Sequence, residues 1–333
     1  MLAGRQLYWI ILWVLPLGMM AQPPGFYVDT LAPYHLQNRF PVVHSDVQTK
    51  VAEKINRYLQ LTELQHLPGD TFLDHPFQKV GRDTLNWGPH VIYSMFEVFP
   101  TELPILSLTI EGTGIGTRAI DFWIYRNFNA LNGDVLYLSD LVSQTGMKKL
   151  CTLYDSLFPY NAPHIELYEF TVRNDSIQIT YDGERADGHL IDGTPDSYKV
   201  FGVREMEPYL SAYGKALLAG RHTSYKSRIL DGSMYIGSIK GSGEAGLFIN
   251  QVYDDGSVNG YLWFQTYPEL IDLSGHVMND SLFELYHTID WDDETNSLRT
   301  DHHMTLILHG NQLMEGTFLF DTGWRGKVRM ERE

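Results

Sequence analysis

The sequence predicts an α+β fold: a mixed-sheet N-terminal domain with a few helices, then an all-β antiparallel meander or barrel-like domain. Helical and strand patterns alternate between residues 23 and 225. From residue 232 onward helical patterns stop, and short β-rich runs recur roughly every ten residues between turn-forming residues. The basic and polar stretch 219–231 lies between the two patterns. We therefore expect domains over 22–225 and 232–333.

Three helices and five strands are expected in the first domain. Residues 46–59 repeat apolar side chains on one face after Ser45 and Asp46, which are good helix caps. Further helices are expected over 141–158 and over 205–214, where Gly214 ends the run. The strands are expected at 91–98, 105–110, 119–127, 166–172 and 176–181. The glycine-rich run 111–117 resembles a phosphate-binding loop, but a strand follows it instead of a helix, so it predicts a hairpin or bulge.

Eight strands are expected in the second domain, joined by short turns rich in Gly, Asn and Asp. They are expected at 234–239, 245–252, 257–265, 270–277, 281–288, 302–308, 312–320 and 326–331. Consecutive hairpins of this kind favour an antiparallel meander that curls into a barrel or half-barrel.

The first 21 residues have the pattern of a secretory signal peptide. Arg5 precedes an apolar run from Leu7 to Met20, which is shorter than the roughly 20 residues of a membrane-spanning helix. Small Ala21 then precedes Gln22. We expect cleavage after Ala21 and a bacterial periplasmic or secreted protein without a membrane span after cleavage. The alternative is an uncleaved membrane anchor.

The net charge and the single cysteine exclude some classes of partner and of covalent chemistry. The net charge of −16 opposes binding to nucleic acid and to anionic lipid, so no nucleic-acid partner is expected. Cys151 is the single cysteine, so no internal disulfide forms. Its place beside the apolar stripe of the helix 141–158 predicts a buried structural thiol and not a nucleophile.

Neither a metal, a cofactor nor a catalytic residue is predicted. Alternation along a strand puts Glu284 and His287 on opposite faces, and likewise His302 and His303, unless a bulge intervenes. The Gly/Asp-rich segment 182–197 lacks the spacing of a calcium loop and is typical of a long turn-rich loop. The Gly-x-Ser-x-Gly motif of serine hydrolases is absent.

Aromatic residues of the second domain form the candidate ligand-binding set. It consists of Tyr261, Trp263, Tyr286 and Trp291. Alternation places Tyr261 and Trp263 on one face of their strand, and such a face beside acidic residues suits sugar rings or a protein partner. In the alternative, the sheet is buried on both faces because it packs on the first domain.

Several segments of the first domain carry a shared pattern, namely 40–43, 52–56, 105–108, 128–141, 170–181 and 200–213. This pattern extends over residues 33–218 and resembles a family of bacterial extracytoplasmic domains of unknown function. Members of this family lie beside polysaccharide deacetylase domains or form the outer part of some anti-sigma factors. The resemblance implies an α+β domain outside the cytoplasm and no catalytic residues, because the metal motifs of the deacetylase domain are not found here. The Gly-rich β-meander resembles tails of other exported proteins.

These observations predict a non-enzymatic envelope or secreted protein that binds a glycan or protein ligand. One alternative is a cell-wall glycan hydrolase, whose two carboxylates would lie roughly 5–9.5 Å apart across a cleft. A second alternative is a lipocalin-like carrier of small molecules, which requires a hollow barrel.

Overall fold

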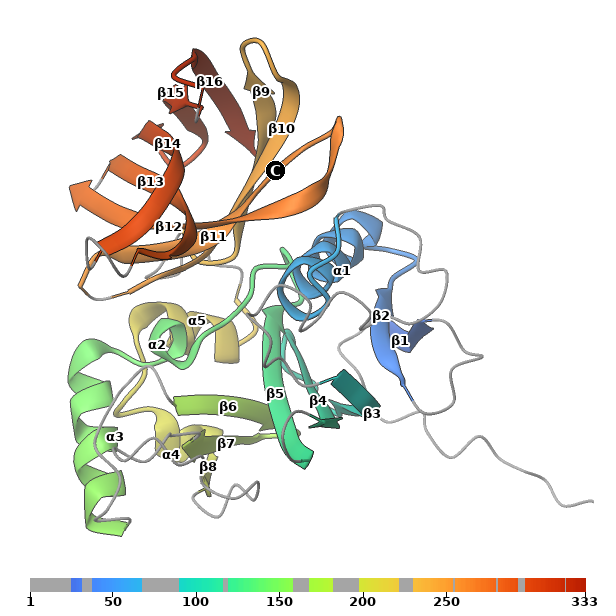
Figure 1. Cartoon of the computed structure of the whole chain (residues 1–333). Coiled ribbons are helices and arrows are strands. Elements are labelled where there is room, and N and C mark those ends of the chain that lie inside the picture. Colours follow the sequence, from blue (N-terminus) through green and yellow to red (C-terminus); the bar gives the residue numbers. More distant parts are fainter. Residues whose placement is uncertain are drawn as a thin grey trace, which may run out of the picture.

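A computed structural model confirms the α+β fold class and closes the second half into an eight-stranded barrel (Figure 1). It describes residues 25–31, 38–67, 90–115, 119–157, 168–181, 198–221, 230–253, 255–279, 281–292, 297–320 and 322–333. The predicted signal peptide and the loop 182–197 lie outside these residues. Of the described helices, none is both long and apolar enough to cross a membrane.

The N-terminal part begins with a small sheet and a helix. Strands β1 (Tyr27–Leu31) and β2 (Phe40–His44) pair antiparallel, and α1 (Thr49–Glu63) follows. The predicted cap at Ser45 and Asp46 is wrong, because α1 begins after Gln48, which makes no side-chain cap bond; the Ser45 hydroxyl instead accepts the Gln48 N–H at 2.9 Å in the turn before the helix. Strands β3 (His90–Phe99), β4 (Ile105–Ile115) and β5 (Ala119–Asn129) make an antiparallel sheet in that order.

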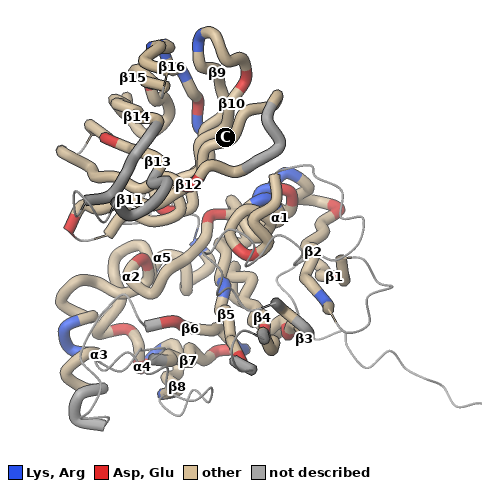
Figure 2. The backbone as a smooth tube through the Cα atoms, in the orientation of Figure 1, with Lys and Arg blue, Asp and Glu red and all other residues tan. Residues whose placement is uncertain are grey.

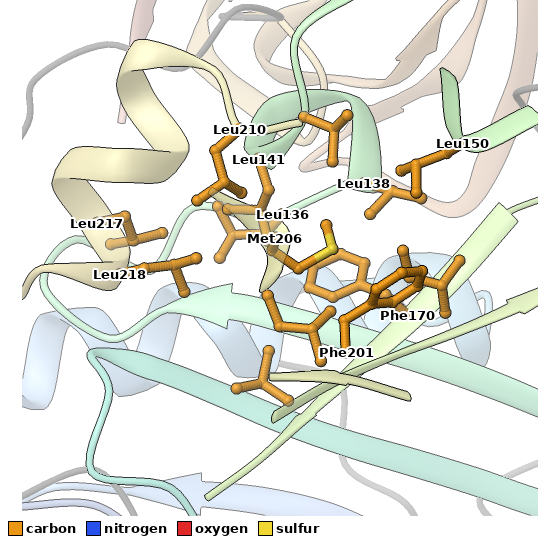
Figure 3. Close-up of a cluster of buried hydrophobic side chains, with 14 of the residues drawn as sticks. Leu136, Leu138, Leu141, Leu150, Phe170, Phe201, Met206, Leu210, Leu217 and Leu218 are labelled. Carbon is orange, nitrogen blue, oxygen red and sulfur yellow. The ribbon is translucent and has the colours of Figure 1, made fainter. Parts of the chain in front are cut away.

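A second sheet and four short helices complete this part. The sheet contains β6 (Tyr168–Arg173), β7 (Ser176–Tyr181) and β8 (Tyr198–Gly202), all antiparallel. The helices are α2 (Leu138–Leu141), α3 (Gln144–Leu157), α4 (Val203–Met206) and α5 (Ala212–Leu218). Apolar side chains of these helices, such as Leu141, Met206 and Leu217, pack with Phe170 of β6 in one buried cluster (Figure 3).

Two buried polar side chains join the two three-stranded sheets. The Ser107 hydroxyl donates to the side-chain oxygen of Asn127 at 2.7 Å and accepts the Val172 N–H at 3.0 Å. The Asn127 amide donates to the Phe170 carbonyl at 2.6 Å. These bonds replace the missing strand pairing between β6 and the β3–β5 sheet, and they fix the position of β6 beside β5.

The barrel is an up-and-down meander in which each strand pairs antiparallel with the next and β16 returns to β9. Its strands are β9 (Ser233–Ile239), β10 (Gly243–Val252), β11 (Ser257–Phe264), β12 (Tyr267–Asn279), β13 (Leu282–Asp292), β14 (Ser297–His309), β15 (Leu313–Leu319) and β16 (Arg325–Arg332). Buried side chains such as Tyr235, Leu262, Phe283 and Phe318 fill the interior. The carrier alternative, which requires a hollow barrel, stays a prediction.

The outer wall of the barrel packs against the N-terminal part. Met234, Phe248 and Trp263 of the barrel belong to the same buried cluster as α1 and the β3–β5 sheet. The ring of Tyr58 meets that of Phe248 edge-on at 5.6 Å between centroids, and Arg57 pairs with Glu333. The two parts therefore share a hydrophobic core, and whether residues 22–225 fold alone stays a prediction.

Candidate functional site

A pocket of about 200 Å³ lies where the two parts meet. Junctions of this kind are frequent ligand sites, although pockets for drug-sized ligands are larger, roughly 300–1,000 Å³. The pocket is lined by α1, β5, the segment before and into α2, β6 and β10. Its lining residues are Tyr58, Tyr125, Arg126, Asn127, Val135, Leu136, Tyr137, Leu138, Glu169, Phe170, Asn250 and Gln251.

Arg126 is the cation of this pocket. Its Nε donates to Glu63 at 2.6 Å, and its Nη1 donates to the Tyr125 carbonyl at 2.8 Å and lies 3.8 Å from Glu169. Burial lowers the pKa of Arg126, but Glu63, Tyr58 and Glu169 together outweigh burial and raise this pKa above its usual value. Its remaining nitrogen, Nη2, has no hydrogen bond or ion pair with the described residues, so it can donate to a ligand.

Two tyrosine hydroxyls link the N-terminal part to the barrel at the same place. The Tyr58 and Tyr137 oxygens lie 3.2 Å apart, and the Tyr137 hydroxyl donates to the Asn250 carbonyl at 3.2 Å. Burial raises the pKa of both phenols above the usual 10.0, so both are neutral at physiological pH. These bonds hold the two walls of the pocket together.

A β-bulge in β10 gives the barrel side of the pocket its polar groups. The β10–β11 register shifts between Ile249 and Gln251, which leaves Asn250 as the extra residue. In a regular strand, Asn250 and Gln251 would point to opposite faces, yet both line the pocket. Neither side-chain amide has a hydrogen-bond partner among the described residues, and both residues are partly exposed. Both amides are available to a ligand.

The pocket supplies binding groups but no acid pair. Of the carboxylates in the described chain, Glu169 alone lines it, and its charged neighbour there is the guanidinium of Arg126, whereas a glycosidase uses two carboxylates. Within the described part, no three His, Cys, Asp or Glu side chains gather to hold a metal ion. The arrangement can bind a small group with several hydroxyls through amides, a guanidinium, a carboxylate and aromatic walls.

Two of the four predicted ligand-binding aromatics lie at the junction, close to this pocket but not in it. Trp263 is 8% exposed and packs in the cluster shared with α1. Tyr261 is partly buried against the same cluster, with its ring stacked 6.4 Å from that of Phe248. Both positions agree with the expectation that the sheet is buried on both faces because it packs on the first domain. The burial of Trp263 leaves it little surface for a ligand.

The other two predicted aromatics lie farther along the barrel. Tyr286 is partly buried on the outer wall, 6.1 Å from the ring of His303. Trp291 pairs with Leu298 through the backbone, and its side chain lies outside the described residues. A ligand-binding role for these two residues stays a prediction.

The histidines near Tyr286 depart from simple alternation. The β13–β14 register shifts between Tyr286 and His287, so His302 forms a bulge with a φ of 48°. Its ring turns inward and stacks 6.1 Å from that of His287. The sequence gives no direct indication of such bulges, here or at Asn250.

A comparison with known protein families and with curated proteins finds no match to this chain. The resemblance of residues 33–218 to an extracytoplasmic domain family therefore stays a prediction.

Proposed function

We propose that the protein is an exported, non-enzymatic binding protein that holds one sugar unit of a glycan in the pocket between its two parts. The bulge at Asn250 carries this proposal, because it brings two consecutive residues with unpartnered side-chain amides, Asn250 and Gln251, into the lining of the pocket that also contains Arg126. β-Bulges recur beside functional sites, where they redirect side chains at a cost to regular pairing.

A sugar ring fits both the size and the chemistry of the pocket. Each sugar hydroxyl both donates and accepts hydrogen bonds, as do the amides of Asn250 and Gln251. Arg126 donates, Glu169 accepts, and the ring of Tyr58 supplies an apolar wall. A flat protein partner would need a far wider surface, about 800 Å² per partner in standard interfaces.

The proposal is tested with a glycan array probed with the chain from residue 22 onward. We expect a neutral glycan to bind, and expect Gln251→Ala to weaken its binding at least tenfold without lowering the melting temperature. Gln312→Ala is the matched control, because Gln312 is an exposed glutamine on the turn between β14 and β15. Asn250→Ala is a second variant, since its side chain has no partner in the described structure.

Two outcomes would overturn the proposal. Equal binding by the wild type and Gln251→Ala would place the site elsewhere. Release of shortened glycan during incubation would make the protein a hydrolase, which the single carboxylate of the pocket does not predict.

A further inference from the structure

Trp324 forms a fixed, exposed platform at the end of the barrel that points away from the N-terminal part. Its side chain is 42% exposed. Its ring lies so close to Gly241 in the neighbouring hairpin that a Cβ there would come within 2.2 Å of it. Phe320 supports the ring at 4.9 Å between centroids, and the Phe320 N–H donates to the Trp324 carbonyl at 2.9 Å. One side of the indole is thus held by protein while part of the ring stays open to solvent.

Three basic residues lie in the backbone segments next to this ring. Lys240 precedes Gly241, Arg325 follows Trp324, and Lys327 lies beside Lys240, whose N–H donates to the Lys327 carbonyl at 2.8 Å. All three side chains are exposed, and blue segments mark these turns in Figure 2. Within the described residues, none of the three has an ion pair, whereas the neighbouring Arg329 pairs with Glu315 and Glu331.

This concentration of positive charge is unusual in a chain with a net charge of −16. Like charges on directly adjacent strands destabilise a sheet, and Lys240 and Lys327 are such neighbours. Because salt screens charges beyond about 8 Å, the local cations and not the net charge determine how strongly a charged ligand is attracted to this surface.

We propose that Trp324, Lys240, Arg325 and Lys327, which we name the barrel-end cluster, bind a polysaccharide that carries carboxylate groups. A pyranose ring would stack on the free part of the indole, and its carboxylate would pair with the cations, Arg325 bidentately. The cluster lies away from the pocket and binds independently of it, so this inference goes beyond the proposed function.

The position of the ring favours a sugar over a membrane surface. A tryptophan that anchors a protein in a bilayer extends into the lipid beside other apolar side chains. Trp324 instead lies against glycine backbone, where a Cβ at Gly326 would also come within 2.9 Å of its ring. Its chain neighbours in the described structure are Gly323 and Arg325, which are not apolar anchors.

The experiment titrates the chain from residue 22 onward with oligogalacturonate, and with neutral dextran oligomers as the reference. We expect binding of oligogalacturonate alone, weaker at 200 mM than at 50 mM salt. Trp324→Ala should weaken it at least about tenfold, as for a binding hot spot. The double variant Lys240→Ala/Lys327→Ala should reduce the salt dependence as well as the affinity. Arg329→Ala is the matched control, since its charge is already paired, and should bind as the wild type.

Each contrary result overturns the proposal. These results are no binding of oligogalacturonate, equal binding of dextran, or unchanged binding by both the tryptophan and the double-lysine variants. Tighter binding to vesicles containing phosphatidylglycerol than to oligogalacturonate would make the barrel-end cluster a membrane-binding surface. Gln251→Ala should leave oligogalacturonate binding intact, which separates a failure here from a failure of the pocket.

Discussion

Replacing Trp263 with alanine tests whether the barrel completes the core of the N-terminal part. The indole is 8% exposed and packs among residues of α1 and the β3–β5 sheet. Truncating a buried tryptophan costs about 3–5 kcal/mol, so Trp263→Ala should lower the free energy of unfolding by that amount. The matched control Trp324→Ala removes a ring that is 42% exposed and should lower the free energy of unfolding by less than Trp263→Ala does.

Gly246 makes this prediction sharper, because it lies directly opposite Trp263 in the β10–β11 ladder. A Cβ at Gly246 would come within 2.0 Å of the indole. Gly246→Ala alone should therefore cost about 1–3 kcal/mol through overpacking. In the Trp263→Ala background the clash is gone, and the same change should be neutral or stabilise by about 0.4–1 kcal/mol.

Urea unfolding of the four proteins in this double-mutant cycle measures the coupling directly. We expect a coupling energy of at least about 1 kcal/mol between the two sites. Equal costs of Gly246→Ala in both backgrounds would refute the packing of Trp263 over Gly246. If Trp263→Ala had the same free energy of unfolding as the wild type, Trp263 would have to lie on an exposed face of the barrel.

Four further predictions concern the rest of the molecule. Glu63→Gln leaves Arg126 without its closest anion and should cost about 3–5 kcal/mol in urea unfolding, whereas Glu97→Gln, in an exposed pair, should cost under about 1 kcal/mol. Burial raises the pKa of Tyr213, Tyr235 and Tyr261 from 10.0 to about 12. The free energy of unfolding should therefore be highest below pH 10 and fall towards pH 12. A free energy of unfolding that stays constant over that range would contradict this. Cys151 is 7% exposed and should react with a thiol reagent far more slowly in the native than in the unfolded chain; equal rates would show an accessible thiol. N-terminal sequencing of the protein from its native source should begin at Gln22, and a start at Met1 would refute the signal peptide.

The barrel strands were predictable because alternation along each strand matches burial. In β16, for example, Gly326, Val328 and Met330 are buried while the residues between them are exposed. The predicted and observed limits of β9 and β16 differ by one residue at most. The sequence predicted either a closed barrel or a half-barrel. Closure depends on the pairing of β16 with β9, which lie at opposite ends of the domain sequence, so hairpin patterns do not indicate it.

The helix predicted over 141–158 is α3, which begins three residues later than expected, and the reason is local. Val142 is extended and bridges to Leu210, and the Ser143 hydroxyl accepts the Gly146 N–H at 3.0 Å. Ser143 thus begins α3 in the manner of a helix cap. The apolar repeat starts before this cap, so periodicity alone placed the start of the helix too early.

The pocket was not predictable, because its residues come from segments far apart in the chain and depend on a bulge. The sequence did contain one indication for Arg126, because this residue follows Ile120, Phe122 and Ile124 at every second position. Alternation along the strand therefore places the Arg126 side chain on the apolar face of β5. Glu63 likewise lies four residues after Leu59 on the apolar face of α1. A buried cation and a buried anion were thus implied separately, but their pairing was not.

The central claim, that the pocket between the two parts holds a sugar, is tested most directly by a crystal structure with the glycan that binds best on the array. We predict electron density for one sugar unit in contact with Asn250, Gln251 and Arg126. Density for the sugar at another surface, with none in this pocket, would contradict the claim.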